Sequence, residues 1–322
     1  MRRIVQLGAL WTLLAICFAT AFAQSFPSKP IRLIVPWPPG GGTDLLARIY
    51  AGRLADTIGQ QVVVENRPGA GGIIGSEAVA KAEPDGHTLL WAAGSHTTVA
   101  AITPKLPFDP IKSFEPVARV AITPLAIVVT PGLPARNVTE LAALAKAKKG
   151  ELNYGSAGNG SINHLAGELF NLNAGGGLVH VGYKGLGPAI VDLLGGRVHA
   201  MFASMPSVMS HVKQDKLRAI GVMGERRSAL LPEVPTLAEG GYAGLDLYVW
   251  WGVLAPAGTP ANAIAKLNAD TQRVLATAEM TTRLAAEGAE PTPGTAEAFG
   301  EFMARDLARW RTLVRDANIR VE

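Results

Sequence analysis

Cysteine is almost absent from this sequence of 322 residues: the only one, Cys17, lies in the apolar N-terminal stretch. Intramolecular disulfides are therefore excluded, and stability depends on the hydrophobic core. Charged residues make up only 17%, and no basic run is longer than two residues, which excludes an extended nucleic-acid surface. With 48% hydrophobic residues, the sequence excludes disorder and predicts roughly two folded domains.

Apolar runs of transmembrane length are missing after residue 23. Before it, two arginines, a short apolar stretch and an A-x-A sequence at residues 21–23 are typical of a secretory signal peptide. We therefore expect residues 1–23 to be cleaved and the mature protein to be exported. An uncleaved membrane anchor is the alternative. A lipoprotein anchor at Cys17 is disfavoured, because Ile16 is large where such signals have a small residue.

Signatures of common enzymes are missing as well. After residue 23 there is no G-x-S-x-G elbow of serine hydrolases, and the six histidines show neither the H-x-x-x-H nor the H-E-x-x-H spacing of zinc sites. No lysine follows the first glycine-rich turn, so a P-loop is excluded there, and the G-x-G-x-x-G dinucleotide pattern is absent from it. We predict no catalytic residue, no metal and no cofactor.

Strands and helices alternate along the rest of the sequence, which indicates βαβ units and mostly parallel sheets. We expect strands at 31–35, 61–64, 88–92, 125–129, 152–154, 178–181, 198–203, 217–222 and 247–254, and helices at 43–58, 71–81, 138–148, 162–172, 188–194, 207–213, 261–276, 280–287 and 295–316. Segments 104–124 and 226–244 are interpreted as connections. We expect two lobes, 24–124 with 247–322 and 125–246, and a ligand cleft between them.

The first glycine-rich turn, P-P-G-G-G-T-D at residues 38–44, joins an apolar strand to a helix. The first turn of a helix has N–H groups without partners at the positive end of the helix dipole, and glycine lets a ligand approach them. Gly41, Gly42 and Thr43 are therefore candidates to bind an anion. Asp44 is expected to favour the helix start and hold the loop. A purely structural turn is the alternative interpretation.

A second glycine-rich turn, Y-G-S-A-G-N-G-S at residues 154–161, has the same place in the second predicted lobe. Ser161 suits a helix N-cap, and Ser156 can donate from the end of the strand. A third turn, Y-K-G-L-G-P at 183–188, also leads into a helix. If the first two turns face each other across a cleft, they can hold opposite ends of one anion, at about 1.5–3 kcal/mol for each hydrogen bond to a charged group.

Together these motifs resemble the Bug-type periplasmic receptors of tripartite tricarboxylate transporters. The resemblance spans essentially the whole chain and includes P-I-R-L-I-V-P at 30–36, V-E-N-R-P-G-A-G-G at 64–72, P-D-G-H-T at 84–88, P-E-V-P-T at 232–236 and A-P-A-G-T-P at 255–260. It implies an α/β fold: a two-lobed periplasmic binding protein of type II, or Venus flytrap, with two doubly wound sheets and an interlobe cleft. It also implies a periplasmic monomer that binds a small carboxylate and delivers it to the transporter's membrane subunits.

The resemblance implies that both glycine-rich turns contact the ligand, with further contacts from a pocket wall, a rim and the third turn. The implied binding residues are Trp37, Gly41, Gly42, Thr43, Ser95, Ser156, Gly158, Ser161 and Gly185. One position departs from the family pattern, because many relatives have an aspartate where this chain has Ala203. Such a carboxylate can pair with a ligand nitrogen, so its loss at this binding position predicts a ligand without an ammonium group.

Two other functions stay open at this point. One is an exported α/β enzyme, for example a hydrolase that uses Ser156 or Ser161, and the other is a ligand sensor for two-component signalling. We expect His164 to pack within its helix and Trp250 and Trp251 to pack in the core, with ligand contact as the alternative for each.

Overall fold

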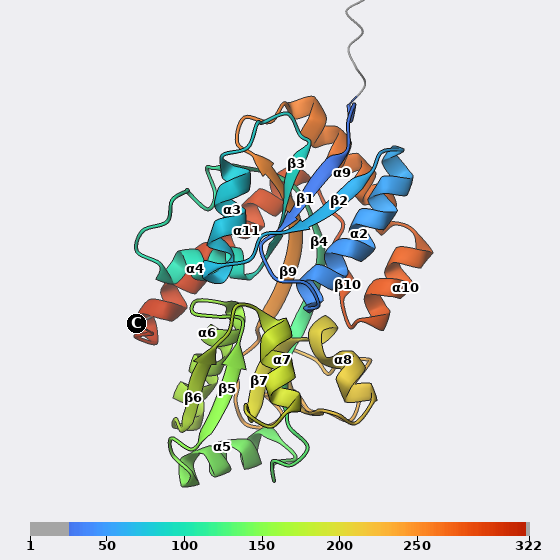
Figure 1. The fold of residues 1–322 in the computed structure, drawn as a ribbon. Helices are drawn as coiled ribbons and strands as arrows, with labels where there is room; N and C mark the ends of the chain where they lie inside the picture. The colour runs from blue at the N-terminus through green and yellow to red at the C-terminus, as the bar shows by residue number, and fades with distance from the viewer. Residues whose placement is uncertain (1–25, 320–322) are drawn as a thin grey trace, which may run out of the picture.

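The computed structural model describes residues 26–319, which form two α/β lobes (Figure 1). The predicted signal peptide lies outside the described residues, and none of the described helices has the length and apolar character to cross a bilayer. The first lobe contains β1 (Ile31–Val35), α2 (Gly42–Ile58), β2 (Val62–Asn66), a 3₁₀ turn (Ala70–Gly72), α3 (Ile73–Ala80), β3 (Thr88–Ala93), α4 (Ser95–Ile102), the first part of β4 (Phe114–Val129), β9 (Tyr248–Pro256), α9 (Ala261–Leu275), α10 (Ala278–Ala286), β10 (Glu290–Pro291) and α11 (Ala296–Asp316).

The second lobe lies below the first in Figure 1 and is built from one stretch of chain. It contains α5 (Val138–Ala147), β5 (Leu152–Ser156), α6 (Ile162–Ala174), β6 (Leu178–Gly182), α7 (Leu186–Leu194), β7 (Ala200–Ser204), α8 (Met205–Lys213) and β8 (Arg218–Met223). The predicted α/β alternation is confirmed in both lobes.

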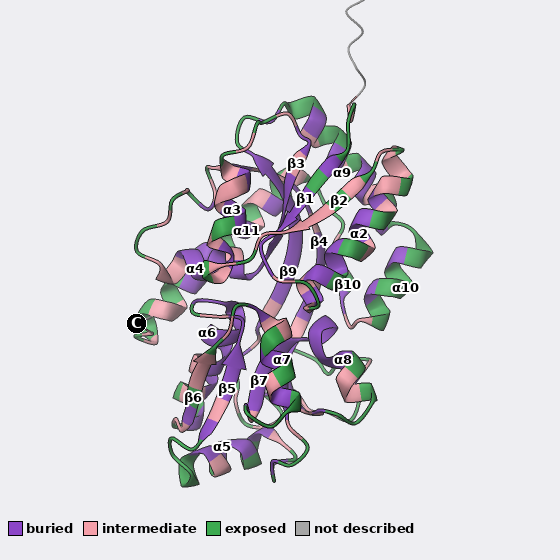
Figure 2. Cartoon of the chain, viewed as in Figure 1, coloured by how far each residue is buried: buried purple, intermediate pink, exposed green. Residues whose placement is uncertain are grey.

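Parallel strands form the side of each sheet away from the junction. β1 pairs in parallel with β2 and β3, and β5 pairs in parallel with β6 and β7. In β1, Ile31, Leu33 and Val35 are 0% exposed and Ile34 only 1%. Successive side chains of a strand point to opposite faces, so this near-continuous burial shows that both faces of the sheet are covered. Figure 2 shows the buried strands between helices whose outer faces are exposed.

Strand β4 belongs to both sheets. Its first part pairs antiparallel with β9 as far as Pro124, and from Leu125 it pairs antiparallel with β7 and β8. The pairing partners of β4 therefore change between Pro124 and Leu125. The chain returns at the start of β9, where the Leu125 amide donates to the Leu247 carbonyl at 3.1 Å.

The prediction of an irregular connection throughout 104–124 is wrong from residue 114 onward, because β4 begins there. Its two prolines occupy positions where a missing N–H is tolerated. Pro116 lies at a shift in the register with β9, and Pro124 lies where the pairing partners change. Helix α4 was not predicted as a helix. Four of its eight residues are β-branched (Thr97, Thr98, Val99 and Ile102), so its helical form depends on packing against α6 and α11.

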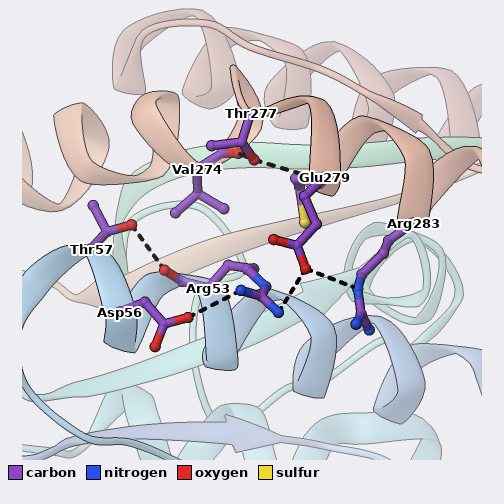
Figure 3. Close-up of polar contacts among 8 residues, drawn as sticks. Arg53, Asp56, Thr57, Val274, Thr277, Glu279 and Arg283 are labelled. Carbon is purple, nitrogen blue, oxygen red and sulfur yellow. Dashed lines mark hydrogen bonds and ion pairs between the residues drawn. The ribbon is translucent and has the colours of Figure 1, made fainter.

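Polar contacts join α2 to the C-terminal helices (Figure 3). Arg53 of α2 forms an ion pair with Glu279 of α10 at 2.8 Å and another with Asp56 of its own helix at 3.2 Å. Arg283 of α10 approaches the same Glu279 at 3.5 Å. These groups are partly exposed, so the packing of α2 against α9 and α10, rather than the ion pairs, supplies most of the stability here.

Candidate functional site

A cavity lies between the lobes, at the carboxyl ends of strands from both sheets, and we call it the inner pocket. Its free space for water-sized molecules is about 30 Å³. None of its lining residues, all within the described chain, is charged. They are Trp37, Pro38, Gly41, Gly42, Thr43, Ala93, Ser95 and Val249 from the first lobe, with Ala157, Ile162, Asn163, Leu186 and Ser204 from the second.

The start of α2 faces this pocket with its backbone groups. Gly41 is the N-cap residue, and it has no side chain that could cap the helix. Thr43 accepts a hydrogen bond from Trp251 Nε1 at 3.1 Å, so its hydroxyl keeps its own proton to donate. The lining of the pocket therefore includes the positive end of α2, a helix of 17 residues, and a hydroxyl donor. Neither group carries a full charge.

Asp44 holds the glycine turn, as the sequence predicts. Its carboxylate is 5% exposed and accepts from the Gly40 amide at 3.2 Å, from Arg48 Nε at 3.0 Å and from Asn66 Nδ2 at 2.8 Å. Burial alone would raise the pKa of Asp44, but these three donors outweigh burial and hold its pKa below the ordinary value. The first-lobe turn is thus stabilised by a charged group that lies behind the pocket.

The glycines of the turn also allow the lobes to touch. The Gly42 amide donates to Ser207 Oγ of α8 at 3.1 Å, and a Cβ added at Gly42 would lie 2.6 Å from that oxygen and 2.8 Å from the Ser207 nitrogen. Likewise, a Cβ on Gly185 would lie 2.6 Å from Pro38 of the other lobe. Larger residues at these positions would push the lobes apart, so part of the glycine pattern reflects contact between the lobes.

Two further hydrogen bonds cross between the lobes near α4. Thr98 Oγ1 donates to the Gly160 carbonyl at 2.8 Å, and the Ile162 amide donates to Ser95 Oγ at 3.3 Å. Ile162 and Gly42 are the first residues of α6 and α2, so each of these helix starts donates to a serine of the opposite lobe.

The second-lobe turn is arranged differently, because neither of its serines is among the residues that line the inner pocket. Ser156 and Ser161 are both 0% exposed. Ser156 Oγ lies 2.6 Å from His180 Nε2 and accepts from the Gly158 amide at 3.0 Å. Ser161 caps α6 by accepting from the His164 amide at 3.3 Å, which confirms the predicted N-cap.

Two histidines stack beneath this turn, with ring centroids 3.9 Å apart. His164 Nδ1 accepts from the Gly160 amide at 3.2 Å, so the ring supports the loop from inside, in agreement with the predicted packing role. Burial lowers the pKa of His164. Burial, followed by the proximity of His164, lowers the pKa of His180 to about 4. Both rings are therefore neutral at pH 7.

The predicted binding residues divide into five groups by position. Five of them line the inner pocket: Trp37, Gly41, Gly42, Thr43 and Ser95. Gly158 lines a second cavity at the mouth, Ser156 and Ser161 lie beneath the second turn, and Gly185 contacts Pro38. Ala203 is 0% exposed in a core cluster of the second lobe. Ligand contact by all ten residues stays a prediction.

Sequence reasoning missed much of the second-lobe lining. Because neighbouring strand residues point to opposite faces, the β7 residue at the cavity is Ser204 rather than Ala203. Asn163 also lines the pocket, and its side-chain amide is fixed by donation to the Phe202 carbonyl at 2.7 Å. The available signal was position: Ala157 lies within the second glycine turn, and Ile162 and Asn163 follow it directly, but these residues carry no anion-binding pattern of their own.

The larger second cavity, which we call the mouth pocket, has about 320 Å³ of space for water-sized molecules. It shares Trp37 and Ala157 with the inner pocket. Its other lining residues are Gly69, Ala70, Gly71, Gly158, Asn159, Gly182, Tyr183 and Lys184. Two cavities of different size therefore adjoin each other at Trp37 and Ala157.

Comparison with known proteins identifies the family. Residues 46–319 match the model of the tripartite tricarboxylate transporter family receptor. The chain belongs to this receptor family. Protein BugT of Bordetella pertussis is 38% identical over 324 residues, which covers 100% of this chain and 99% of that protein. Family members are solute-binding receptors, so the enzyme alternative is set aside, and no group of residues suited to hold a metal ion occurs within 26–319.

Solved structures of receptors in this family share the fold. A Rhodopseudomonas palustris protein with adipate superposes with a TM-score of 0.89 at 34% identity, covering 92% of this chain and 99% of that one. MatC from the same organism, with bound malate, gives a TM-score of 0.86 at 32% identity, covering 90% and 100% of the two chains. These matches confirm the two-lobed periplasmic binding protein fold.

Proposed function

We propose that this protein is a periplasmic receptor that binds a small organic carboxylate in the inner pocket and delivers it to the membrane subunits of a tripartite transporter. The observation that carries the proposal is the start of α2 beside the Thr43 hydroxyl, in an uncharged cavity between the lobes, where the N-cap residue Gly41 has no side chain to cap the helix. Such a site favours anions through backbone N–H groups and the helix dipole. That two structurally similar receptors hold adipate and malate supports a carboxylate as the ligand.

Neutral donors suit a receptor that must release its ligand. Each hydrogen bond to a carboxylate contributes about 1.5–3 kcal/mol, so three or four of them approach the roughly 8 kcal/mol of a micromolar complex. We propose that residues 24–124 with 247–322 and residues 125–246 move as two lobes around the β4 and β9 crossings, in a monomeric protein. Closure then excludes water from the ligand, and the closed form is recognised by the membrane subunits.

The ligand is expected to lack an ammonium group. Within the described residues, no carboxylate side chain lines the inner or the mouth pocket, so a bound cation would have no ionic partner there. Calorimetry with succinate and aspartate, which differ by one ammonium group, tests this expectation. Succinate should bind at least as tightly as aspartate, and a clear preference for aspartate would contradict it.

A thermal-shift screen of organic acids on refolded, ligand-stripped protein tests the proposed function. A ligand at 100 times its Kd should stabilise the protein by about 2.7 kcal/mol. Failure of every organic acid to stabilise the protein, combined with stabilisation by sugars or cations, would contradict carboxylate binding. Uptake of the identified acid by cells with and without the protein then separates transport from sensing, since only a transport receptor changes the uptake rate.

Export is tested at the N-terminus of the protein recovered from the periplasm. We expect sequencing to begin at Gln24, after removal of residues 1–23. Recovery of the uncleaved chain in the membrane fraction would contradict the signal-peptide prediction.

A further inference from the structure

The two cavities of the cleft differ about tenfold in size, and this difference limits how a ligand can lie. A space of about 30 Å³ in the inner pocket holds roughly two water-sized groups, since one such group needs about 10–15 Å³. That is enough for the two oxygens of one carboxylate. A larger acid needs more room for its body, and the mouth pocket, which shares Trp37 and Ala157 with the inner pocket, has about 320 Å³ of open space.

Lys184 is the only charged residue, among those described, that lines either cavity. It is exposed and forms no ion pair within residues 26–319. Asp192, on the helix that follows, is occupied by Arg197 at 2.8 Å and by the Tyr183 hydroxyl at 2.8 Å. The ammonium group of Lys184 is therefore available to a ligand, while the inner pocket offers only neutral donors.

We propose that Lys184 is a specificity-determining residue that favours ligands with a second negative charge. One carboxylate lies at the start of α2, and the far end of the molecule reaches the mouth pocket beside Lys184. The proposal rests on the function proposed above. It adds that selection between mono- and dicarboxylates is made in the mouth pocket, by one flexible cation that reaches ligands of different lengths.

Matched pairs of acids test the proposal by calorimetry: adipate against hexanoate, and succinate against butanoate. For at least one pair, we expect the diacid to bind at least threefold more tightly. Lys184→Met should weaken binding of that diacid about two- to fivefold, the range for an exposed charge pair, and should leave the monoacid nearly unchanged. High salt should reduce the wild-type preference, because the lysine is exposed to solvent.

Two variants serve as controls. Lys184→Arg keeps the charge and should keep the diacid preference. Lys149→Met removes an exposed lysine of the same lobe that lines neither cavity, and it should change neither affinity. Thermal unfolding of each ligand-free variant checks that folding is unaffected.

The possible failures are distinguishable. If wild type binds both acids of each pair equally, or if the diacid preference persists in Lys184→Met, the role of Lys184 is overturned while the receptor function stands. If no acid of either kind binds and none stabilises the protein in the thermal-shift screen, the proposed function itself fails, and the role of Lys184 fails with it.

Discussion

The two glycine-rich turns have similar sequences but different roles in the cleft. The first-lobe turn directs Gly41, Gly42 and Thr43 toward the inner pocket and has no side-chain cap. The second-lobe turn buries both serines, one as the cap of α6 and the other against His180. A hydroxyl used as a helix cap has already satisfied a backbone donor, whereas the N-cap residue of α2 has no side chain to do so. One amide at the start of α2, that of Gly42, donates to Ser207 of the opposite lobe.

The turns are also held in place by different chemistry. A buried carboxylate with three donors, Asp44, fixes the first turn, whereas a neutral hydroxyl and imidazole, Ser156 and His180, fix the second. We infer that the first lobe provides the permanent anion site and that the second lobe completes the cavity by closing over it. The predictions below separate these two roles.

Loss of Asp44 is expected to have the largest effect on stability. Asp44→Ala removes the acceptor for three donors, one of them charged, and should lower the free energy of unfolding by about 2–3 kcal/mol. Asp56→Ala is the matched control in the same helix, because Asp56 is 71% exposed and should matter by less than about 0.5 kcal/mol. Denaturant titrations measure both, and equal effects would contradict the holding role of Asp44.

Gly42→Ala should block closure. The added methyl group would overlap backbone and side-chain atoms of Ser207, and overpacking of this kind costs about 1–3 kcal/mol. We expect ligand affinity to fall at least fivefold. Gly52→Ala, in the same helix, meets no atom within 4 Å and should leave the affinity unchanged. Calorimetry compares the two variants, and an unchanged affinity for Gly42→Ala would show that the contact between α2 and α8 is not needed for binding.

Ser161→Ala should cost about 1 kcal/mol of stability, since it removes the cap of α6. In a protein of this size, that corresponds to a fall of roughly 1.5–2 °C in Tm. Ser161→Asn, which can also cap a helix, should restore part of the loss. If Ser161→Ala instead abolished ligand binding at unchanged stability, this serine would be a ligand contact and the contrast between the turns would disappear.

Acid should affect the second turn before the first. His180 has a pKa of about 4 when folded and 6.5 as the ordinary value, so the unfolded chain binds more protons between these pH values. Its contribution to stability is therefore present above pH 6.5 and is lost as pH falls toward 4. The pKa of Asp44 lies below its ordinary value of 3.8, so the first turn keeps its charge throughout this window.

The pH effect is measured as the difference between wild type and His180→Gln. Between pH 6.5 and 4, we expect wild type to lose on the order of 1 kcal/mol more than the variant, after allowance for solvent screening of the partly exposed ring. His164 stacks on His180, and burial lowers its pKa as well, so it can contribute to the same transition. Identical pH profiles would contradict a titrating second turn.

Local patterns in the sequence predicted most of the fold, because runs of apolar residues indicate buried strands and capping residues indicate where helices begin. The strand Ile31–Val35, the role of Asp44 and the Ser161 cap all follow from such patterns. The missed features depend on contacts between distant segments. Proline-containing β4 and helix α4 are stabilised by partners remote in sequence, and the direction of Ser204 depends on the exact register of β7.

The most direct measurement is a crystal structure of the protein with the tightest acid from the thermal-shift screen. We expect one carboxylate of that acid in the inner pocket, within hydrogen-bond distance of the α2 backbone start and the Thr43 hydroxyl, with second-lobe residues enclosing it. An acid bound away from the start of α2, for example in the groove lined by Pro124, Arg226 and Tyr248, would contradict the assignment of the helix start as the anion site.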